Sequence, residues 1–303
     1  MAGLTWIDTH CHVSAWGGDG AHRTGLLADL LAVLDAEDED LRMVISLDVG
    51  VELTRMMREP EGILEGNRLI HQLCHHAPGR LYGSCVVNPH FLEASLEAMD
   101  VCFGDWGFVQ LGEMLQYIMR YEMADDAVVR IARHATAYGV PVQVHISTSN
   151  SCRDLSCNGA MHLQDLFALI DRVPEARYVL AHAIGTMAAD PPVIEHYLNL
   201  IDEHFGRLPE NIWLEIRDFN SPGVPAALRR VPASRLLAGT DWVSRVGPPF
   251  LPYGMVFANT TERSNPYPPS VASMAGFLRA AGASEQDVAR IAHGNARELL
   301  GMK

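Results

Sequence analysis

The sequence has 303 residues, of which 48% are hydrophobic, so it can form one large core or two smaller domains. Its formal net charge of −14 at pH 7 argues against a nucleic-acid partner, because phosphate binding relies on clustered Lys and Arg.

The first residues show no basic segment followed by an apolar stretch, and no run approaches the ~18 apolar residues that a membrane-spanning helix needs. The six cysteines are scattered along the chain, a pattern that suits reduced thiols better than a disulfide framework. We therefore expect a cytoplasmic protein with no membrane partner.

Short apolar runs alternate with amphipathic stretches along the whole chain. The runs predict β-strands at Leu4–His10, Met43–Val49, Leu81–Val87, Phe108–Glu113, Pro141–Ile146, Tyr178–Ala183, Ile212–Arg217 and Leu236–Asp241. The amphipathic stretches predict helices at Thr24–Ala36, Glu61–His76, Leu92–Phe103, Asp125–Tyr138, Met161–Val173, Pro192–Phe205, Val224–Val231, Val271–Ala281 and Ser284–Leu300. Eight strands, each followed by a helix, predict an α/β fold of the (β/α)8 or TIM-barrel type.

A doubly wound open sheet is the competing fold, but it would have to stop at six or seven strands. The sequence also contains no Gly-x-Gly-x-x-Gly turn of the kind that binds dinucleotides. No Ser/Gly-rich linker divides the chain, so we predict one domain over residues 1–303. The long irregular segments Ser147–Ala160 and Val243–Ser270 are predicted to be loops at the C-terminal face of the barrel, where active sites lie.

Metal-ligand side chains stand at the C-terminal ends of five predicted strands. They are His10 and His12 on the first, Glu113 on the fourth, His145 on the fifth, His182 on the sixth and Asp241 on the eighth. Because strand side chains alternate, His10 and His12 are expected to point to the same side, into the barrel mouth.

Each of these residues has an ordinary structural explanation when taken alone. A single His is commonly a hydrogen-bonded core residue, Asp241 can cap a turn, and Glu113 can be a solvated loop residue. Buried polar side chains are costly unless they are paired or coordinated, and five strands share the same residue types at the same end. The set therefore predicts a metal site.

The motifs Asp8-Thr9-His10-x-His12, Val144-His145, Ala181-His182-Ala183-x-Gly185 and Gly239-Thr240-Asp241 resemble the amidohydrolase superfamily. The ending Gly294-Asn295-Ala296-Arg297-Glu298-Leu299-Leu300 resembles the C-terminal helix of its amidohydrolase-2 branch. That branch includes aminocarboxymuconate-semialdehyde decarboxylase and related hydrolases, hydratases and decarboxylases. The resemblance extends from residue 5 to residue 300.

The resemblance implies one Zn²⁺ or Mn²⁺ held by His10, His12, His145 and Asp241, with His182 as an acid/base or a substrate-polarising group. Glu113 departs from this pattern, since it stands where the TatD-like hydrolases place a bridging glutamate. Other binuclear members bridge their metals with a carbamylated lysine, which is excluded here because Lys303 is the only lysine.

Two arrangements therefore stay open. In a binuclear centre His10, His12 and Asp241 hold one ion, His145 and His182 hold the other, and Glu113 bridges them. In a mononuclear centre Glu113 orients a ligand histidine. Imidazole and carboxylate ligands suit Zn²⁺ best, with Mn²⁺ or Co²⁺ as alternatives.

The ligand types predict metal-activated water chemistry. A bound metal lowers the pKa of its water towards ~7, and Asp241 would accept the proton as hydroxide attacks the substrate. The main prediction is a metal-dependent hydrolase of a small amide, lactone or ester. The alternative is a lyase, either a non-oxidative decarboxylase or a hydratase, that acts on a small carboxylated substrate. A non-catalytic barrel is a third class, but the ligand set is complete.

The predicted substrate contacts lie near the last two strands. Arg217 shares a strand face with Trp213 and Glu215, and it either projects into the mouth to bind a carboxylate or pairs with Glu215 or Asp218. Trp242 and Arg245 follow the eighth strand as further contacts. The expected partner is a small molecule, and a homodimer is left open.

Overall fold

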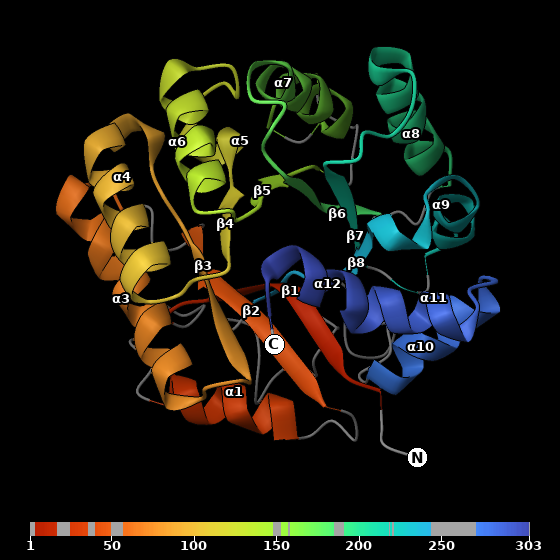
Figure 1. Ribbon diagram of the computed structural model, residues 1–303, viewed down its shortest axis with the longest axis horizontal. Helices are drawn as coiled ribbons and strands as arrows, with labels where there is room; N and C mark the ends of the chain where they lie inside the picture. The colour runs from red at the N-terminus through yellow and green to blue at the C-terminus, as the bar shows by residue number, and fades with distance from the viewer. Residues whose placement is uncertain are drawn as a thin grey trace.

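The computed structural model describes residues 4–16, 25–35, 40–49, 57–147, 153–156, 158–184, 191–217, 219, 221–243 and 271–302. In these residues parallel strands form a nearly closed ring, and Figure 1 shows the helices packed around the outside of the strands. The predicted (β/α)8 barrel is confirmed.

The strands are β1 (Trp6–Val13), β2 (Leu41–Leu47), β3 (Leu81–Cys85), β4 (Gln110–Met114), β5 (Val142–His145), β6 (Tyr178–Ile184), β7 (Ile212–Ile216), β8 (Leu236–Ala238) and β9 (Trp242–Val243). The helices are α1 (Leu26–Asp35), α3 (Pro60–His76), α4 (Leu92–Met99), α5 (Gln116–Met119), α6 (Asp126–Ala137), α7 (Gly159–Arg172), α8 (Pro191–Phe205), α9 (Val224–Arg230), α10 (Val271–Ala280), α11 (Glu285–Ala289) and α12 (Asn295–Leu300). Short 3-10 and π-helical turns join some of them, and α5 was not predicted.

The eighth barrel strand is divided, which corrects the prediction of one strand over Leu236–Asp241. β8 pairs with β7 and β9 pairs with β1, so two short pieces close the ring. Between them Asp241 has a φ of 57°, in the left-handed region that a β-strand does not allow. The break therefore lies at a predicted metal ligand.

The C-terminal helix α12 closes the N-terminal end of the barrel. Its Leu299 and Leu300 form a cluster with strand side chains that include Ile7, Val179 and Leu237. Figure 1 shows α12 lying across the strands near β1 and β8. Because this end is filled by apolar side chains, the opposite, C-terminal end is the one available for chemistry.

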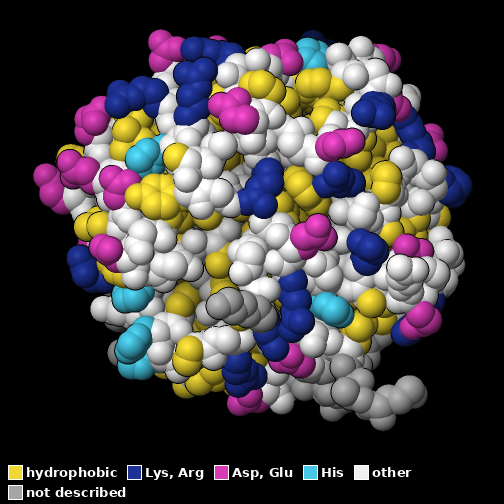
Figure 2. Space-filling view, in the orientation of Figure 1, with side chains coloured by type: hydrophobic (Ala, Val, Ile, Leu, Met, Phe, Trp, Pro, Cys, Tyr) yellow, Lys and Arg dark blue, Asp and Glu magenta, His cyan; other side chains and the backbone are white. Residues whose placement is uncertain are grey.

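Figure 2 shows that Arg side chains are interspersed with Asp and Glu side chains on the face that carries α12. None of the helices within the described ranges is both long enough and apolar enough to span a bilayer.

Gly112 provides a test of how closely β4 and β5 pack. It has a φ of 128°, and a Cβ at this position would lie 2.5 Å from the backbone oxygen of Gln143. We expect Gly112→Ala to lower the free energy of unfolding by about 1–3 kcal/mol, because alanine is strained at this φ and its Cβ would overlap the Gln143 oxygen. Urea denaturation followed by circular dichroism measures this change.

The matched control is Gly276→Ala on the exposed side of α10, where a Cβ would meet no atom within 4 Å. It should raise stability by about 0.5–1 kcal/mol, because glycine is a poor helix former. Equal effects of the two substitutions would contradict the packing described here.

Candidate metal centre

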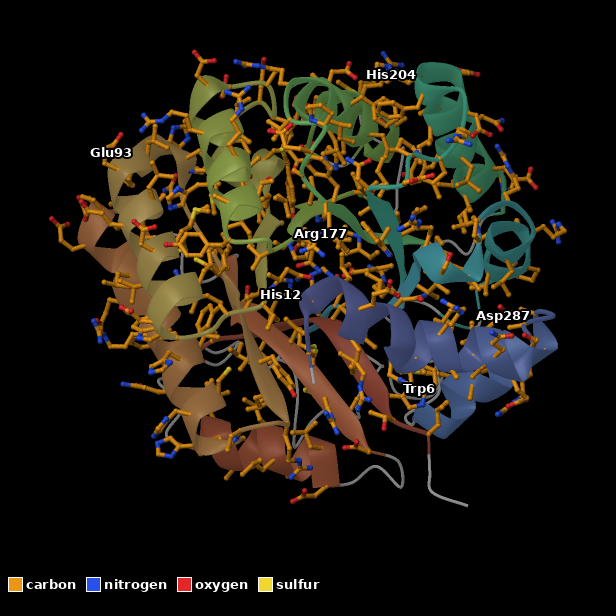
Figure 3. The ribbon with its side chains drawn as sticks, in the orientation of Figure 1. Trp6, His12, Glu93, Arg177, His204 and Asp287 are labelled. Carbon is orange, nitrogen blue, oxygen red and sulfur yellow. The ribbon has the colours of Figure 1, made fainter. Side chains whose placement is uncertain are left out.

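The six predicted ligands come together at the C-terminal end of the barrel. They are His10 and His12 from β1, Glu113 from β4, His145 from β5, His182 from β6 and Asp241 from the β8–β9 junction. Five of them are almost fully buried and His145 is partly buried. Figure 3 labels His12, which lies inside the ring of strands.

His10, His12 and Asp241 form a triangle that fits a metal ion. The Nε2 atoms of His10 and His12 lie 3.0 Å apart, and Asp241 Oδ1 lies 3.8 Å and 3.3 Å from them. Ligands around a tetrahedral Zn²⁺ with bonds of about 2.0–2.1 Å stand about 3.3 Å from one another. The donor types and spacings therefore fit a divalent cation, as the sequence predicted for this trio.

The Glu113 carboxylate lies between two pairs of histidines. Its Oε2 is 3.5 Å from His10 Nε2 and 3.3 Å from His12 Nε2. Its Oε1 is 2.9 Å from His145 Nδ1 and 3.1 Å from His182 Nε2. His10, Glu113 and His182 make a second group that could hold a metal, whereas His145 belongs to neither group.

Glu215 on β7 is the main residue of this site that the sequence analysis missed. Its Oε1 accepts hydrogen bonds from Thr9 (3.0 Å) and Gln143 (2.6 Å). Its Oε2 lies 2.9 Å from His10 Nδ1 and accepts the backbone N–H of His182 at 3.1 Å. The sequence signal was its alternation with Arg217, which suggested only a pairing between those two residues.

These contacts leave the Nε2 atoms of the β1 histidines facing the metal group. His10 Nδ1 is held by Glu215, and His12 Nδ1 lies 3.0 Å from Ser46 Oγ. Such outer partners fix the ring orientation of metal-binding histidines. His182 Nδ1, in contrast, is buried and has no hydrogen-bond partner among the described residues.

The backbone is irregular where the strands deliver their ligands. The parallel registers shift between Asp8 and Cys11 in β1, between Leu111 and Met114 in β4, and between Leu180 and Ile184 in β6. These intervals contain His10, Glu113 and His182, and β-bulges are known to re-aim side chains beside active sites. His182 also has a positive φ, 40°, as Asp241 does.

The buried charges stabilise one another. Burial alone lowers the pKa of His10, but Glu215 and Glu113 outweigh it and raise that pKa well above its usual value. Burial likewise lowers the pKa of His12, yet hydrogen bonds to Asp241 and Glu113 raise it to about 9. Burial raises the pKa of Asp241, but the neighbouring imidazoles lower it to about 2.

Protons on His10 and His12 therefore balance the carboxylates in the absence of another cation. A divalent metal ion can take their place, since its binding requires neutral imidazoles and releases protons.

The predicted substrate contacts have different outcomes. Arg217 is 8% exposed, and its Nη1 lies 3.7 Å from Asp241 Oδ2, so it does reach the metal group. The backbone of Trp242 lies in β9 and pairs with Cys11 of β1, but the Trp242 side chain is outside the described part of the structure. Arg245 is also outside the described residues.

His162 on α7 supports the site from behind His145, and the sequence analysis did not single it out. Its Nδ1 accepts the Ser147 N–H at 3.0 Å, and its Nε2 donates to the Leu155 carbonyl oxygen at 2.6 Å. Its ring packs against the His145 ring with centroids 5.3 Å apart. The neutral His162 tautomer with its proton on Nε2 thus links Ser147 and Leu155, two residues of the segment that follows β5.

Burial lowers the pKa of His162 to about 4, compared with 6.5 for an exposed histidine. Between these values the unfolded chain binds a proton that the folded chain does not, so the His162 contribution to stability is lost as pH falls from about 6.5 to about 4. The full loss amounts to about 3 kcal/mol. His162→Gln keeps a donor and an acceptor but cannot titrate, and we expect it to flatten the pH dependence of stability in this interval.

Urea denaturation at a series of pH values measures this slope. His196→Gln, on the exposed side of α8, is the matched control and should leave it unchanged. An unchanged slope in His162→Gln would show that other groups produce the pH dependence.

Comparisons with known proteins identify the family and the fold. A family model described as Amidohydrolase matches residues 7–302. No curated protein sequence matches the chain. Among solved structures, dihydroxybenzoic acid decarboxylase from Polaromonas sp. JS666, with bound manganese and the inhibitor 2-nitroresorcinol, has a TM-score of 0.66 and 16% identity, over 100% of this chain and 98% of that one.

Two further structures have the same fold. 5-Carboxyvanillate decarboxylase from Sphingomonas paucimobilis has a TM-score of 0.64 at 16% identity, over 99% of this chain and 100% of that one. 4-Oxalomesaconate hydratase from Rhodopseudomonas palustris has a TM-score of 0.63 at 15% identity, over 98% and 96%. At these identities the likeness shows the fold alone.

Proposed function

This chain belongs to the amidohydrolase family, and from that premise we propose that it is a metal-dependent lyase, a non-oxidative decarboxylase or a hydratase of a small carboxylated substrate. The observation that carries the proposal is the buried guanidinium of Arg217 beside the metal group, 3.7 Å from Asp241. A buried guanidinium at a metal site suits a substrate carboxylate, which it binds with planar, charge-assisted hydrogen bonds. The decarboxylases and the hydratase of the same fold support this choice.

The metal would be held by His10, His12 and Asp241, with Glu113 and His182 close enough to complete its ligands. When bound, a Zn²⁺, Mn²⁺ or Co²⁺ ion polarises a substrate oxygen and fixes its position. The manganese in the dihydroxybenzoic acid decarboxylase is consistent with this chemistry.

The protein's own groups handle the protons. In decarboxylation Arg217 orients the carboxylate, the C–C bond breaks, CO₂ leaves, and His182 delivers a proton to the carbon that keeps the electron pair. In hydration Asp241 takes a proton from water, and the water oxygen adds to one carbon of a substrate double bond. His182 protonates the other carbon. Hydration would use Asp241 and His182 as an acid/base pair, whereas decarboxylation would use His182 alone as the acid.

A screen of small aromatic and unsaturated carboxylates, read as CO₂ release or loss of the double bond, tests the proposal. We expect turnover that is lost on treatment with a chelator and returns with Mn²⁺ or Zn²⁺. His10→Ala and Asp241→Asn should reduce it at least about 10³-fold while the protein stays folded. Arg217→Met should raise KM for a carboxylated substrate more than Arg217→Lys does. Full activity of metal-stripped Asp241→Asn protein would refute the metal-dependent mechanism.

A hydrolase of a small amide, lactone or ester is the second candidate, and the position of Glu113 favours it. Each of its oxygens faces a different pair of histidines, which is the arrangement expected for a carboxylate that bridges two ions. Two ions would activate water for attack on an sp² carbon and stabilise the leaving group.

Metal stoichiometry separates the two candidates. For the lyase we expect one ion per chain, with Glu113→Gln retaining that ion. For the hydrolase we expect two ions, falling to one in Glu113→Gln, together with hydrolysis of lactones or amides. Elemental analysis of protein dialysed against each metal gives the count. Four expectations from the sequence stay predictions: one domain over the whole chain, a cytoplasmic location, a small-molecule partner, and a homodimer as one option for the oligomeric state.

A further inference from the structure

The C-terminal end of α3 carries a group of histidines that lies outside the barrel and apart from the candidate metal centre. The sequence over residues 71–76 reads His-Gln-Leu-Cys-His-His. His71 is partly exposed, and His75 and His76 are exposed. Figure 2 shows His side chains low on the left of the molecule, in the region where Figure 1 shows α3. These imidazoles are therefore accessible to ions in solution.

The spacing of His71 and His75 suits one shared metal ion. The two residues are four positions apart, so their side chains lie on the same face of the helix. Their ring centroids are 6.2 Å apart, and the ring planes are inclined by 39°. An ion at the usual metal–nitrogen distance lies about 3.2 Å from the centroid of each imidazole that binds it, so two such centroids are at most about 6.4 Å apart. The observed spacing is within this limit, and rotation of the exposed side chains adjusts the angle between the rings.

The ring nitrogens of this pair are not used by other polar groups. Within the described part of the chain, the side chains of His71 and His75 make no hydrogen bond and no ion pair. The face of the His71 ring packs on the Trp106 ring, with centroids 4.5 Å apart and an angle of 14° between the planes. Stacking uses the face of a ring and leaves its edge, where both nitrogens lie, free to bind. Trp106 therefore restrains His71 without occupying a ligand atom, which lowers the entropy cost of binding.

The local charge permits a cation at this position. His75 lies in the last turn of α3, where the carbonyl groups of the helix place partial negative charge. Arg68 is the neighbouring cation, with its guanidinium 5.6 Å from the centroid of the Trp106 ring. Arg68 Nε lies 3.0 Å from Glu65 Oε2, so the Glu65 carboxylate partly offsets the charge of Arg68.

We propose that His71 and His75 form a second metal site, at which the two imidazoles chelate one late divalent transition-metal ion. Imidazole ligands suit Cu²⁺, Ni²⁺ and Zn²⁺, whereas Mn²⁺ is the most weakly bound ion of the first-row series. The pair binds more tightly than one imidazole because the second bond forms within the same complex. An ion held here adds to the metal count of protein dialysed against Zn²⁺ but not to the count with Mn²⁺. The site is independent of the reaction proposed for the buried centre.

The test uses the Zn²⁺-loaded protein and the complex of Cu²⁺ with iminodiacetate as the probe. Iminodiacetate occupies part of the coordination sphere of Cu²⁺ and leaves positions open for two imidazoles. The bulk of this complex keeps it out of the buried centre, whose ligands hold Zn²⁺. Isothermal titration calorimetry at pH 7 measures binding without requiring turnover. We expect one tight site per chain, which either His71→Gln or His75→Gln weakens at least about tenfold.

The matched control is His76→Gln at the same end of the helix. His76 is exposed and follows His75 directly, and neighbouring residues of a helix do not face each other. This variant should leave the affinity for the probe unchanged. Circular dichroism checks that all three variants keep the fold of the parent protein.

Fluorescence locates the bound ion. A Cu²⁺ ion quenches the emission of a tryptophan beside it, and the Trp106 ring contacts the His71 ring. We expect quenching that saturates at one probe per chain. Trp106→Phe should remove this quenching while calorimetry still detects binding, since phenylalanine also stacks on an imidazole.

Two results would overturn the second site. One is an affinity for the probe that neither His71→Gln nor His75→Gln changes, because the ion would then be held elsewhere on the protein. The other is an equal loss of affinity in His76→Gln and His71→Gln, since that would show binding to scattered single histidines and not to a chelating pair.

Discussion

The organisation of the site depends on one buried carboxylate inside the barrel. Glu215 reaches from β7 to the Thr9 hydroxyl, the His10 ring, the Gln143 amide and the backbone of His182, and it thereby links β1, β5, β6 and β7. An anion inside a protein is stable only when donors surround it. Gly239 makes room for it, since a Cβ there would lie 2.6 Å from the Glu215 carboxyl carbon. The same contacts that stabilise this charge orient the ring of His10 and hold the backbone of His182, two of the candidate metal ligands.

Glu113 lies at the other nitrogen of the same ring, since its Oε2 is 3.5 Å from His10 Nε2 whereas Glu215 contacts His10 Nδ1. Its two oxygens face different histidine pairs, so the carboxylate is placed to serve one metal ion or two. His10 and His12 carry protons where no other cation balances Glu113 and Asp241, because both pKa values are raised, that of His12 to about 9. The negative charge of the cluster therefore favours the binding of one or two divalent cations. In the two functions proposed above, one ion corresponds to the lyase and two ions to the hydrolase.

The sequence predicted the barrel and the convergence of the ligands because both follow from repeating patterns. Strand alternation placed His10 and His12 on one side, and parallel strands bring their C-terminal ends together. It did not predict the break in the eighth strand. The residues around Asp241 make contacts with residues far away in the sequence, such as the hydrogen bond from Thr240 N–H to Asp8, and a local pattern does not reveal such contacts. Glu215 and His162 were missed for a related reason. A glutamate in a strand or a histidine in a helix has the same local sequence pattern whether it forms a salt bridge or contacts a candidate metal ligand, as Glu215 contacts His10 and His162 contacts His145.

The closure of the barrel by α12 has a consequence for biosynthesis. The ribosome delivers the nine strands of the described residues before it delivers the helix whose Leu299 and Leu300 cover the layer formed by Ile7, Val179 and Leu237. Until α12 emerges, that apolar layer lacks the cover that Leu299 and Leu300 provide, and exposed apolar surface makes such intermediates prone to aggregation. The nascent barrel must therefore avoid aggregation with one end open until α12, which is synthesised after the described strands, packs against the first of them.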